Sequence, residues 1–200
     1  MKTWWLALVL STLSVVTFVG AVGPQAGVST LEQTPAMVAK LLAERHAVVQ
    51  LPVKGKVSRK IALEDDTFAM PGGPSRAVLL SLPEYRAPYV LIVKSFLYKR
   101  AMSRTEKVFV PTTILLDSNY RITRTVSEAQ LEANEAGMIK GPSYQATIQI
   151  TETQSDERFV LIYTDGAAVG DPIPVVNQRW GFRAQRSPDG DIEAETKPNK

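Results

Sequence analysis

The longest β-type pattern in the chain covers residues 88–98. β-branched and aromatic residues dominate this stretch, and its proline stands at the first position, where a strand tolerates one. Up to residue 93 both alternating faces are apolar, with Tyr89, Leu91 and Val93 on one face and Val90 and Ile92 on the other. Apolar residues on both faces are typical of a strand inside a sheet. The pattern therefore predicts a central strand that is covered on both sides.

A helical period precedes the strands. Thr34 is a typical N-cap residue, and Pro35 is typical of the first position of a helix. Val38, Leu41 and Leu42 follow at spacings of three and four residues, which places them on one helical face. We expect a short amphipathic helix that docks on the following domain.

From about residue 57 onward the period changes to two residues. Strand patterns cover the ranges 57–63, 77–82, 107–116, 120–126, 146–150, 157–164 and 180–184. Turn residues separate these patterns about every ten residues, a spacing typical of antiparallel sandwiches. The alternation of strands and helices that indicates a parallel sheet is missing. The predicted fold class is all-β: an antiparallel β-sandwich, of jelly-roll or carbohydrate-binding-module type, with a short N-terminal helix.

The N-terminal residues have the pattern of a secretory signal peptide. A basic start at Lys2 leads into a stretch from Trp4 to Gly23 without a charged residue. Small residues at 19–21 place the expected cleavage after Ala21. An uncleaved membrane anchor is the alternative, because the apolar run approaches the roughly 20 residues that span a bilayer. Hydroxyl residues dilute the run and no basic stop-transfer cluster follows, so the pattern favours cleavage and no stable membrane insertion afterwards.

These patterns divide the chain into four parts. The signal peptide covers residues 1–21, a linker with the short helix covers 22–56, and the sandwich covers 57–186. Residues 187–200 are charged and contain proline and glycine, so we expect them to form a flexible tail.

Composition excludes several kinds of site. The chain has no cysteine, which removes disulfides, thiolate metal ligands and cysteine nucleophiles. A single histidine removes sites built from several histidines, and a net charge of +3 is too small to indicate nucleic-acid binding. We therefore expect no metal, cofactor or nucleic acid.

No group of residues points to catalysis. His46 could act as a general base, but its place after the helix favours a role at the helix C-terminus. The acidic clusters at 64–66 and 189–193 lack the ligand spacing of a calcium loop, and Asp117 precedes residues typical of a turn. The sequence therefore predicts a protein that is not an enzyme.

A series of short motifs carries a resemblance to a known family. They are Phe68–Pro71, Leu82-Pro83, the strand at 88–95, Val108–Pro111 leading into Ile114–Asn119, and Phe159–Thr164 followed by Asp171–Pro174. Their order and spacing, over roughly residues 60–195, resemble the maltose operon periplasmic protein family. The resemblance implies a periplasmic, non-enzymatic accessory protein of maltose and maltodextrin uptake.

Carbohydrate uptake directs attention to aromatic residues, because sugar rings stack on exposed aromatic side chains. Trp180 lies beside Arg179, and Tyr120 lies beside Asn119, so each aromatic residue has a neighbour that can bind sugar hydroxyls. These four residues are the candidate oligosaccharide site. The alternative is that Trp180 belongs to the core and Tyr120 caps it.

A second hypothesis is a cell-envelope structural or adaptor protein that binds another protein. Lys94, Lys99 and Arg100 cluster around one hairpin and could bind an acidic partner. The same residues are also typical of a solvated hairpin end, where lysines prevent edge-to-edge pairing. Both functions remain open at the level of the sequence.

Overall fold

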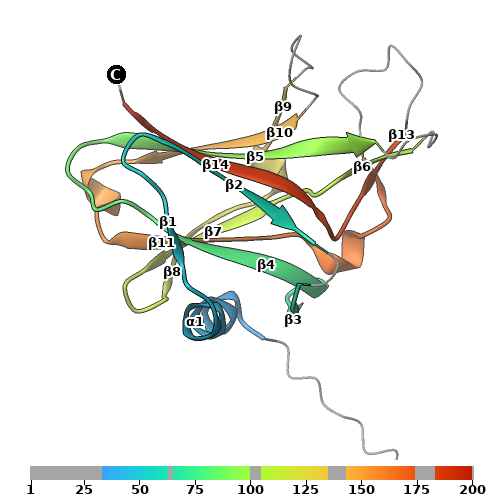
Figure 1. The fold of residues 1–200 in the computed structure, drawn as a ribbon, viewed down its shortest axis with the longest axis horizontal. Helices are drawn as coiled ribbons and strands as arrows, with labels where there is room; N and C mark the ends of the chain where they lie inside the picture. The colour runs from blue at the N-terminus through green and yellow to red at the C-terminus, as the bar shows by residue number, and fades with distance from the viewer. Residues whose placement is uncertain (1–32, 63–64, 100–104, 135–142, 174–182, 200) are drawn as a thin grey trace, which may run out of the picture. The chain divides into compact units, whose positions relative to one another are not determined.

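The computed structural model describes residues 33–62, 65–99, 105–134, 143–173 and 183–199. Their strands form two sheets that pack face to face as a β-sandwich (Figure 1). The predicted fold class is therefore confirmed. The predicted signal peptide lies outside the described residues.

The first sheet contains six of the described strands. Their order is β1 (Val49–Gln50), β4 (Gly73–Ser81), β11 (Glu157–Tyr163), β7 (Thr112–Asp117) and β8 (Ile122–Val126), and β3 (Thr67–Met70) also pairs with β4. The pairs are antiparallel except β1 with β4, which is parallel. β3 and β1 pair with the same edge of β4. The pairing with β3 ends at Arg76 of β4, and the pairing with β1 starts at Leu80 of β4.

The second sheet contains eight of the described strands. Their order is β12 (Pro172–Ile173), β13 (Arg183–Arg186), β6 (Thr105–Val108), β5 (Tyr89–Lys99), β10 (Ser143–Ile150) and β9 (Glu132–Asn134). β14 (Gly190–Pro198) also pairs with β5, and β2 (Gly55–Ile61) pairs with β14. β13 runs parallel to β6, so the sandwich is mainly but not wholly antiparallel.

Helical structure in the described residues is limited to α1 (Pro35–Arg45) and three short 3₁₀ turns, η1 (Glu128–Gln130), η2 (Glu152–Gln154) and η3 (Gly166–Ala168). The Thr34 hydroxyl accepts a hydrogen bond from the Met37 N–H at 3.3 Å, as expected of an N-cap. Val38 and Leu42 bury against the outer face of the six-stranded sheet. The predicted amphipathic helix is confirmed, and no helix among the described residues has the length and apolarity to cross a membrane.

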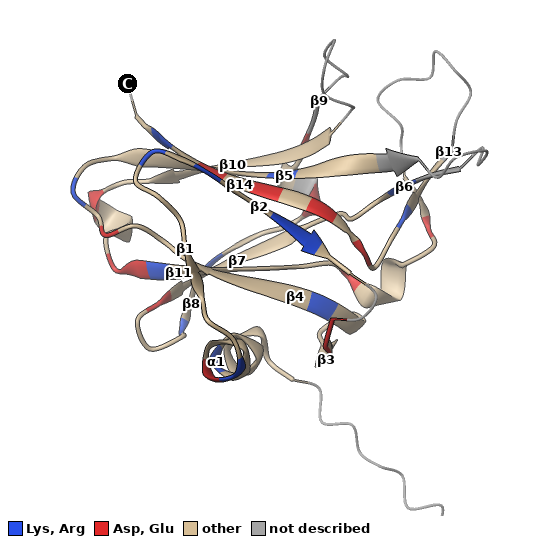
Figure 2. Ribbon diagram, viewed as in Figure 1, with Lys and Arg blue, Asp and Glu red and all other residues tan. Residues whose placement is uncertain are grey.

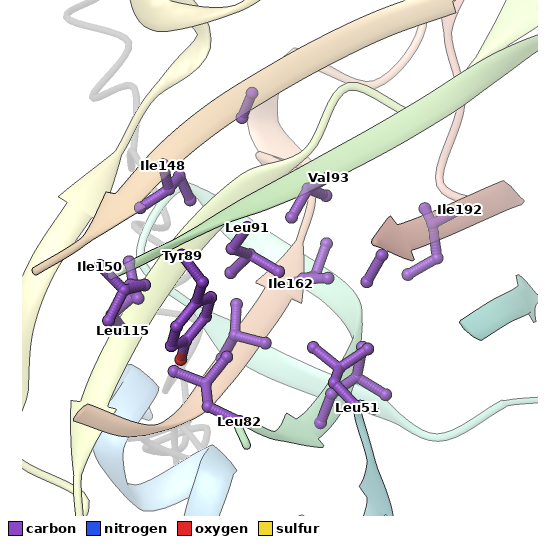
Figure 3. Packing of buried hydrophobic residues seen from close by; sticks show 14 of the residues in the cluster. Leu51, Leu82, Tyr89, Leu91, Val93, Leu115, Ile148, Ile150, Ile162 and Ile192 are labelled. Atoms are coloured by element: carbon purple, nitrogen blue, oxygen red, sulfur yellow. The ribbon is translucent and has the colours of Figure 1, made fainter. Parts of the chain in front are cut away.

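The main core lies between the two sheets. Leu91 and Val93 of β5 are fully buried, together with Leu115 of β7 and Ile162 of β11. Figure 3 shows these side chains pointing into the same space, with the Tyr89 ring beside them. Alternate residues of β5 therefore supply the inner face of the eight-stranded sheet.

β5 is a central strand, as predicted, but only one of its faces lies in the core. One edge of β5 pairs with β10. The other edge pairs with β14 along residues 89–95 and with β6 along residues 97–99. On the outer face Val90 is half-buried, and Ile92, at 9% exposure, belongs to none of the apolar clusters of the described residues. Its lateral neighbours on the adjacent strands are Thr147 and Glu195. The prediction of cover on both sides is wrong, because neighbours within the sheet shield Ile92.

The prediction of a flexible tail from residue 187 is wrong for Gly190–Pro198, which form β14. Ile192, Ala194 and Thr196 point inward and are buried, while charged residues alternate with them. A Cβ atom at Gly190 would lie 2.7 Å from Cβ of Phe109, so glycine lets the strand begin close to the backbone of that residue. The sandwich therefore extends from β1 to β14, beyond the predicted limits of 57–186.

Truncating a side chain on the inner face of β5 should lower the free energy of unfolding more than truncating one on its outer face. Leu91→Ala should lower the free energy of unfolding by about 2–5 kcal/mol, because it opens a cavity in the closed core. Ile92→Ala should cost about 1 kcal/mol, because the outer face can readmit water. Urea denaturation of both variants measures the difference. An equal or larger loss in Ile92→Ala would contradict the assignment of the two faces.

Candidate functional site

A groove lies where the edge of the six-stranded sheet meets the eight-stranded sheet, between β8 and β10. β9 pairs with β10 only at Ser143–Gln145, so the described residues leave the rest of that edge of β10 open. The β8–β10 groove has a volume of about 270 Å³ and is lined by Arg124, Thr125, Val126, Gln130, Thr147, Ile148 and Gln149. It is therefore bounded by strand edges from both sheets.

A buried ion pair holds this groove together. The Arg124 Nε and Nη2 atoms donate to the two carboxylate oxygens of Glu157 at 2.8 and 2.7 Å. The Thr123 hydroxyl also donates to Oε1 of Glu157, at 2.9 Å. The Glu157 side chain is only 1% exposed, so these donors replace the water that it loses.

The same guanidinium joins the two sheets. Arg124 lies on β8, and its Nη1 atom donates to the backbone carbonyl of Gln149 on β10 at 3.0 Å. One side chain therefore bonds to β11 in its own sheet and to β10 in the other. Burial, and then the charge of Glu157, raises the pKa of Tyr89 to about 12, so this phenol stays neutral beside the ion pair.

The groove presents amide, hydroxyl and apolar groups. The Gln130 Oε1 atom accepts from the Ser127 N–H at 3.0 Å, which fixes the amide and leaves its N–H groups to donate. The Thr147 hydroxyl accepts from Gln145 at 3.0 Å. Because Glu157 neutralises the charged lining residue, Arg124, the groove is polar but without free charge.

A second cleft lies at the opposite seam of the sandwich. The α1–β4 cleft has a volume of about 390 Å³, and its lining comes from the end of α1, β1, β2, β3 and residues 77–79 of β4. Its two acidic residues are already engaged. Asp65 accepts from the Ala62 N–H at 2.7 Å, and Asp66 pairs with Arg45 at 3.4 Å.

Charged residues also run along the outer face of the eight-stranded sheet, on β14 and β2 (Figure 2). Lys56 pairs with Glu193 at 2.8 Å, and this hydrogen bond raises the pKa of Lys56. Glu195 pairs with Lys197 at 3.1 Å and with Lys94 at 3.6 Å. These pairs form a charge ladder over three strands.

The charge ladder includes Lys94, one of the three residues predicted to bind a partner protein. Lys94 is 19% exposed and is paired within its own sheet. Lys99 ends β5, and Arg100 lies outside the described residues. The shared role of these three residues in binding a protein stays a prediction.

The predicted sugar-binding residues do not line either cleft in the described structure. Trp180 and Arg179 lie outside the described residues. The Tyr120 ring stacks on Phe159 with 4.8 Å between ring centroids and an interplanar angle of 16°, so one of its faces is occupied. Asn119 belongs to the turn and donates its N–H to Asp117 at 2.7 Å.

The residues considered for metal binding and for general-base catalysis take part in local structure. Asp189 accepts from the Ser187 hydroxyl at 2.6 Å. His46 caps the C-terminus of α1 through its backbone N–H, which donates to Leu42. Among the described residues no group of three histidine, aspartate or glutamate side chains is arranged to hold a metal ion.

Sequence reasoning missed the residues that build the β8–β10 groove. Arg124 stands between two threonines in a short strand, and Glu157 opens another strand, so neither forms a motif. The one local signal is the alternation at 146–150, which marks Thr147 and Gln149 as a wet face.

The family model of the maltose operon periplasmic protein precursor (MalM) matches residues 72–193, which include strands of both sheets. The chain belongs to this family. It is therefore a periplasmic protein of the maltose operon type, and the resemblance noted in the sequence is confirmed.

Other comparisons add little. No curated protein matches the chain. A solved structure described as CorA, a surface-associated copper-binding protein important in copper acquisition by Methylomicrobium album BG8, is similar at 7% identity. The match covers 76% of this chain and 98% of that chain with a TM-score of 0.34, which says nothing of function.

The buried ion pair should contribute more than a surface one. Glu157→Gln should lower the free energy of unfolding by about 2 kcal/mol, because Arg124 loses a charged, nearly enclosed partner. The matched control is Glu84→Gln, whose pair with Arg86 is largely exposed and should cost less than about 0.5 kcal/mol. Urea denaturation measures both. Equal costs would contradict a structural role for the Arg124–Glu157 pair.

Proposed function

We propose that this member of the MalM family assists carbohydrate uptake in the periplasm by binding a neutral oligosaccharide, such as a maltodextrin, in the β8–β10 groove. The observation that carries the proposal is the uncharged polar lining of the groove. Maltodextrins carry hydroxyl groups and no charge. A site for such a ligand therefore requires hydrogen-bonding groups and no net charge.

The side chains of the groove suit such a ligand. Amides both donate and accept hydrogen bonds, and hydroxyl groups do the same, as a sugar hydroxyl requires. Gln149 and Thr125 make no side-chain hydrogen bond within the described structure, so they are available to a ligand. Val126, which is half-buried, supplies apolar surface for the C–H face of a sugar ring.

The size of the groove also fits a short stretch of sugar chain. Its volume of about 270 Å³ is close to the small end of ligand sites in proteins, roughly 300–1,000 Å³. Because the groove runs between two open strand edges, a longer oligosaccharide could extend beyond it. Contacts with only part of the ligand favour weak binding.

The proposed role is binding without reaction. Glycoside hydrolysis ordinarily requires two carboxyl groups on either side of the bond that breaks. The described lining of the groove contains no carboxylate, and the neighbouring Glu157 is closed off by Arg124 and Thr123. An accessory role in uptake agrees with this chemistry.

The proposal can be tested by titration calorimetry of the mature chain with maltodextrins at two salt concentrations. We expect a dissociation constant of roughly 10 µM to 1 mM. It should hardly change with salt, because no charge is neutralised. Gln149→Ala should weaken binding roughly fivefold, which corresponds to one hydrogen bond.

Two further variants locate the site. The control is Gln50→Ala, an exposed glutamine on β1 outside the groove, which should bind as the unmodified chain does. Trp180→Ala tests the stacking residue predicted from the sequence. No heat with any maltodextrin would contradict sugar binding. A loss in Trp180→Ala with unchanged binding in Gln149→Ala would move the sugar site away from the groove.

A further inference from the structure

The edge of β4 is interrupted at the α1–β4 cleft. β3 pairs with this edge up to Arg76 and β1 resumes the pairing at Leu80, so residues 77–79 have no partner strand there among the described residues. These three residues line the cleft. The gap therefore leaves backbone groups on this edge of β4 without a strand partner.

The direction of those backbone groups follows from their neighbours. The Ser81 carbonyl accepts from the Leu51 N–H on the β1 side, and the Leu82 N–H donates to Arg158 on the opposite side. Peptide groups of successive residues in a strand point to opposite edges. The Leu79 N–H therefore faces the cleft, as a donor without a strand partner.

Basic side chains approach the same space from other elements. Arg59 and Lys60 lie on β2 in the opposite sheet, and His46 follows α1. Within the described structure these three side chains make no ion pair or hydrogen bond. The acidic side chains of the cleft already bind Arg45 and a backbone N–H. The unoccupied side-chain groups of the cleft are therefore mainly donors.

The floor of the cleft is apolar. Phe68 and Leu79 are buried there, beside Val48. An apolar wall lowers the local dielectric constant and strengthens the attraction between a cation and an anion. Arginine can hold two oxygens of one anion in a fork, and lysine adds a point charge.

From this arrangement we infer that the α1–β4 cleft binds a small ligand through an anionic group, a phosphate or a carboxylate. Arg59 and Lys60 hold the anion, the Leu79 N–H donates to it, and the apolar floor receives the rest of the ligand. This site lies at the other seam of the sandwich from the β8–β10 groove. The inference is therefore independent of oligosaccharide binding.

Two further lysines lie on or next to β2 and allow a comparison with Lys60. Lys54 precedes β2, is exposed, and does not line the cleft. Lys56 lies on β2 but is paired with Glu193. If the cations of this edge served only to prevent edge-to-edge pairing, Lys54 would be equivalent to Lys60.

His46 is the single histidine of the chain, so its imidazole gives one unambiguous NMR signal at the cleft. The mature chain is titrated with inorganic phosphate and, separately, with succinate, at fixed pH and with sodium chloride holding the ionic strength constant. We expect a saturable shift of the His46 signal with at least one of them. Phosphate alone would identify a phosphate ligand, and succinate alone would identify a carboxylate.

Variants decide whether the cleft is the site. Arg59→Gln and Lys60→Gln should each raise the dissociation constant roughly tenfold, the effect of one charge-assisted hydrogen bond. Lys54→Gln should leave it unchanged. Thermal melting shows that each variant is folded, and maltodextrin binding in Arg59→Gln should match that of the unmodified chain. No His46 shift at millimolar concentrations of either anion, or an equal loss in Lys54→Gln, would overturn the inference.

Discussion

The architecture depends on the pairing of β14 with β5 on one edge and with β2 on the other. Among the described strands β2 has no partner except β14, so the far side of the eight-stranded sheet is attached through this strand. Arg59 and Lys60 of the α1–β4 cleft lie on β2, opposite Ile192 and Asp191 of β14. The position of this cleft therefore follows from the insertion of the C-terminal strand.

Inserting a charged strand into the middle of a sheet requires compensation. The inward residues of β14 are small or apolar, and Thr196 donates its buried hydroxyl to the Pro52 carbonyl. The outward acids pair with lysines on both neighbouring strands, which forms the charge ladder. Opposite charges across neighbouring strands favour this register, whereas a slip by one residue would bury the acids.

Local pattern explains how much of the fold could be predicted. α1 and β5 were found because helical spacing and a long apolar run are local signals. β14 was missed because its charged residues read as a solvated tail, and its order comes from partners far away in the sequence. The parallel pairs β1–β4 and β13–β6 were missed for the same reason.

The candidate sites depend on where pairing stops, at Arg76 on β4 and at Gln145 on β10, and a sequence does not mark such positions. Aromatic side chains suggested Tyr120, but its ring packs against Phe159, a contact set by the fold of β11.

Amide hydrogen exchange of β14 tests the central claim most directly. If Gly190–Pro198 form a strand with partners on both edges, the amides of Glu193 and Ala194 should exchange as slowly as those of Leu91 and Val93 in β5. All four should then open only when the whole domain unfolds. Exchange of the Glu193 and Ala194 amides at the rate of an unfolded peptide, with β5 still protected, would contradict the account.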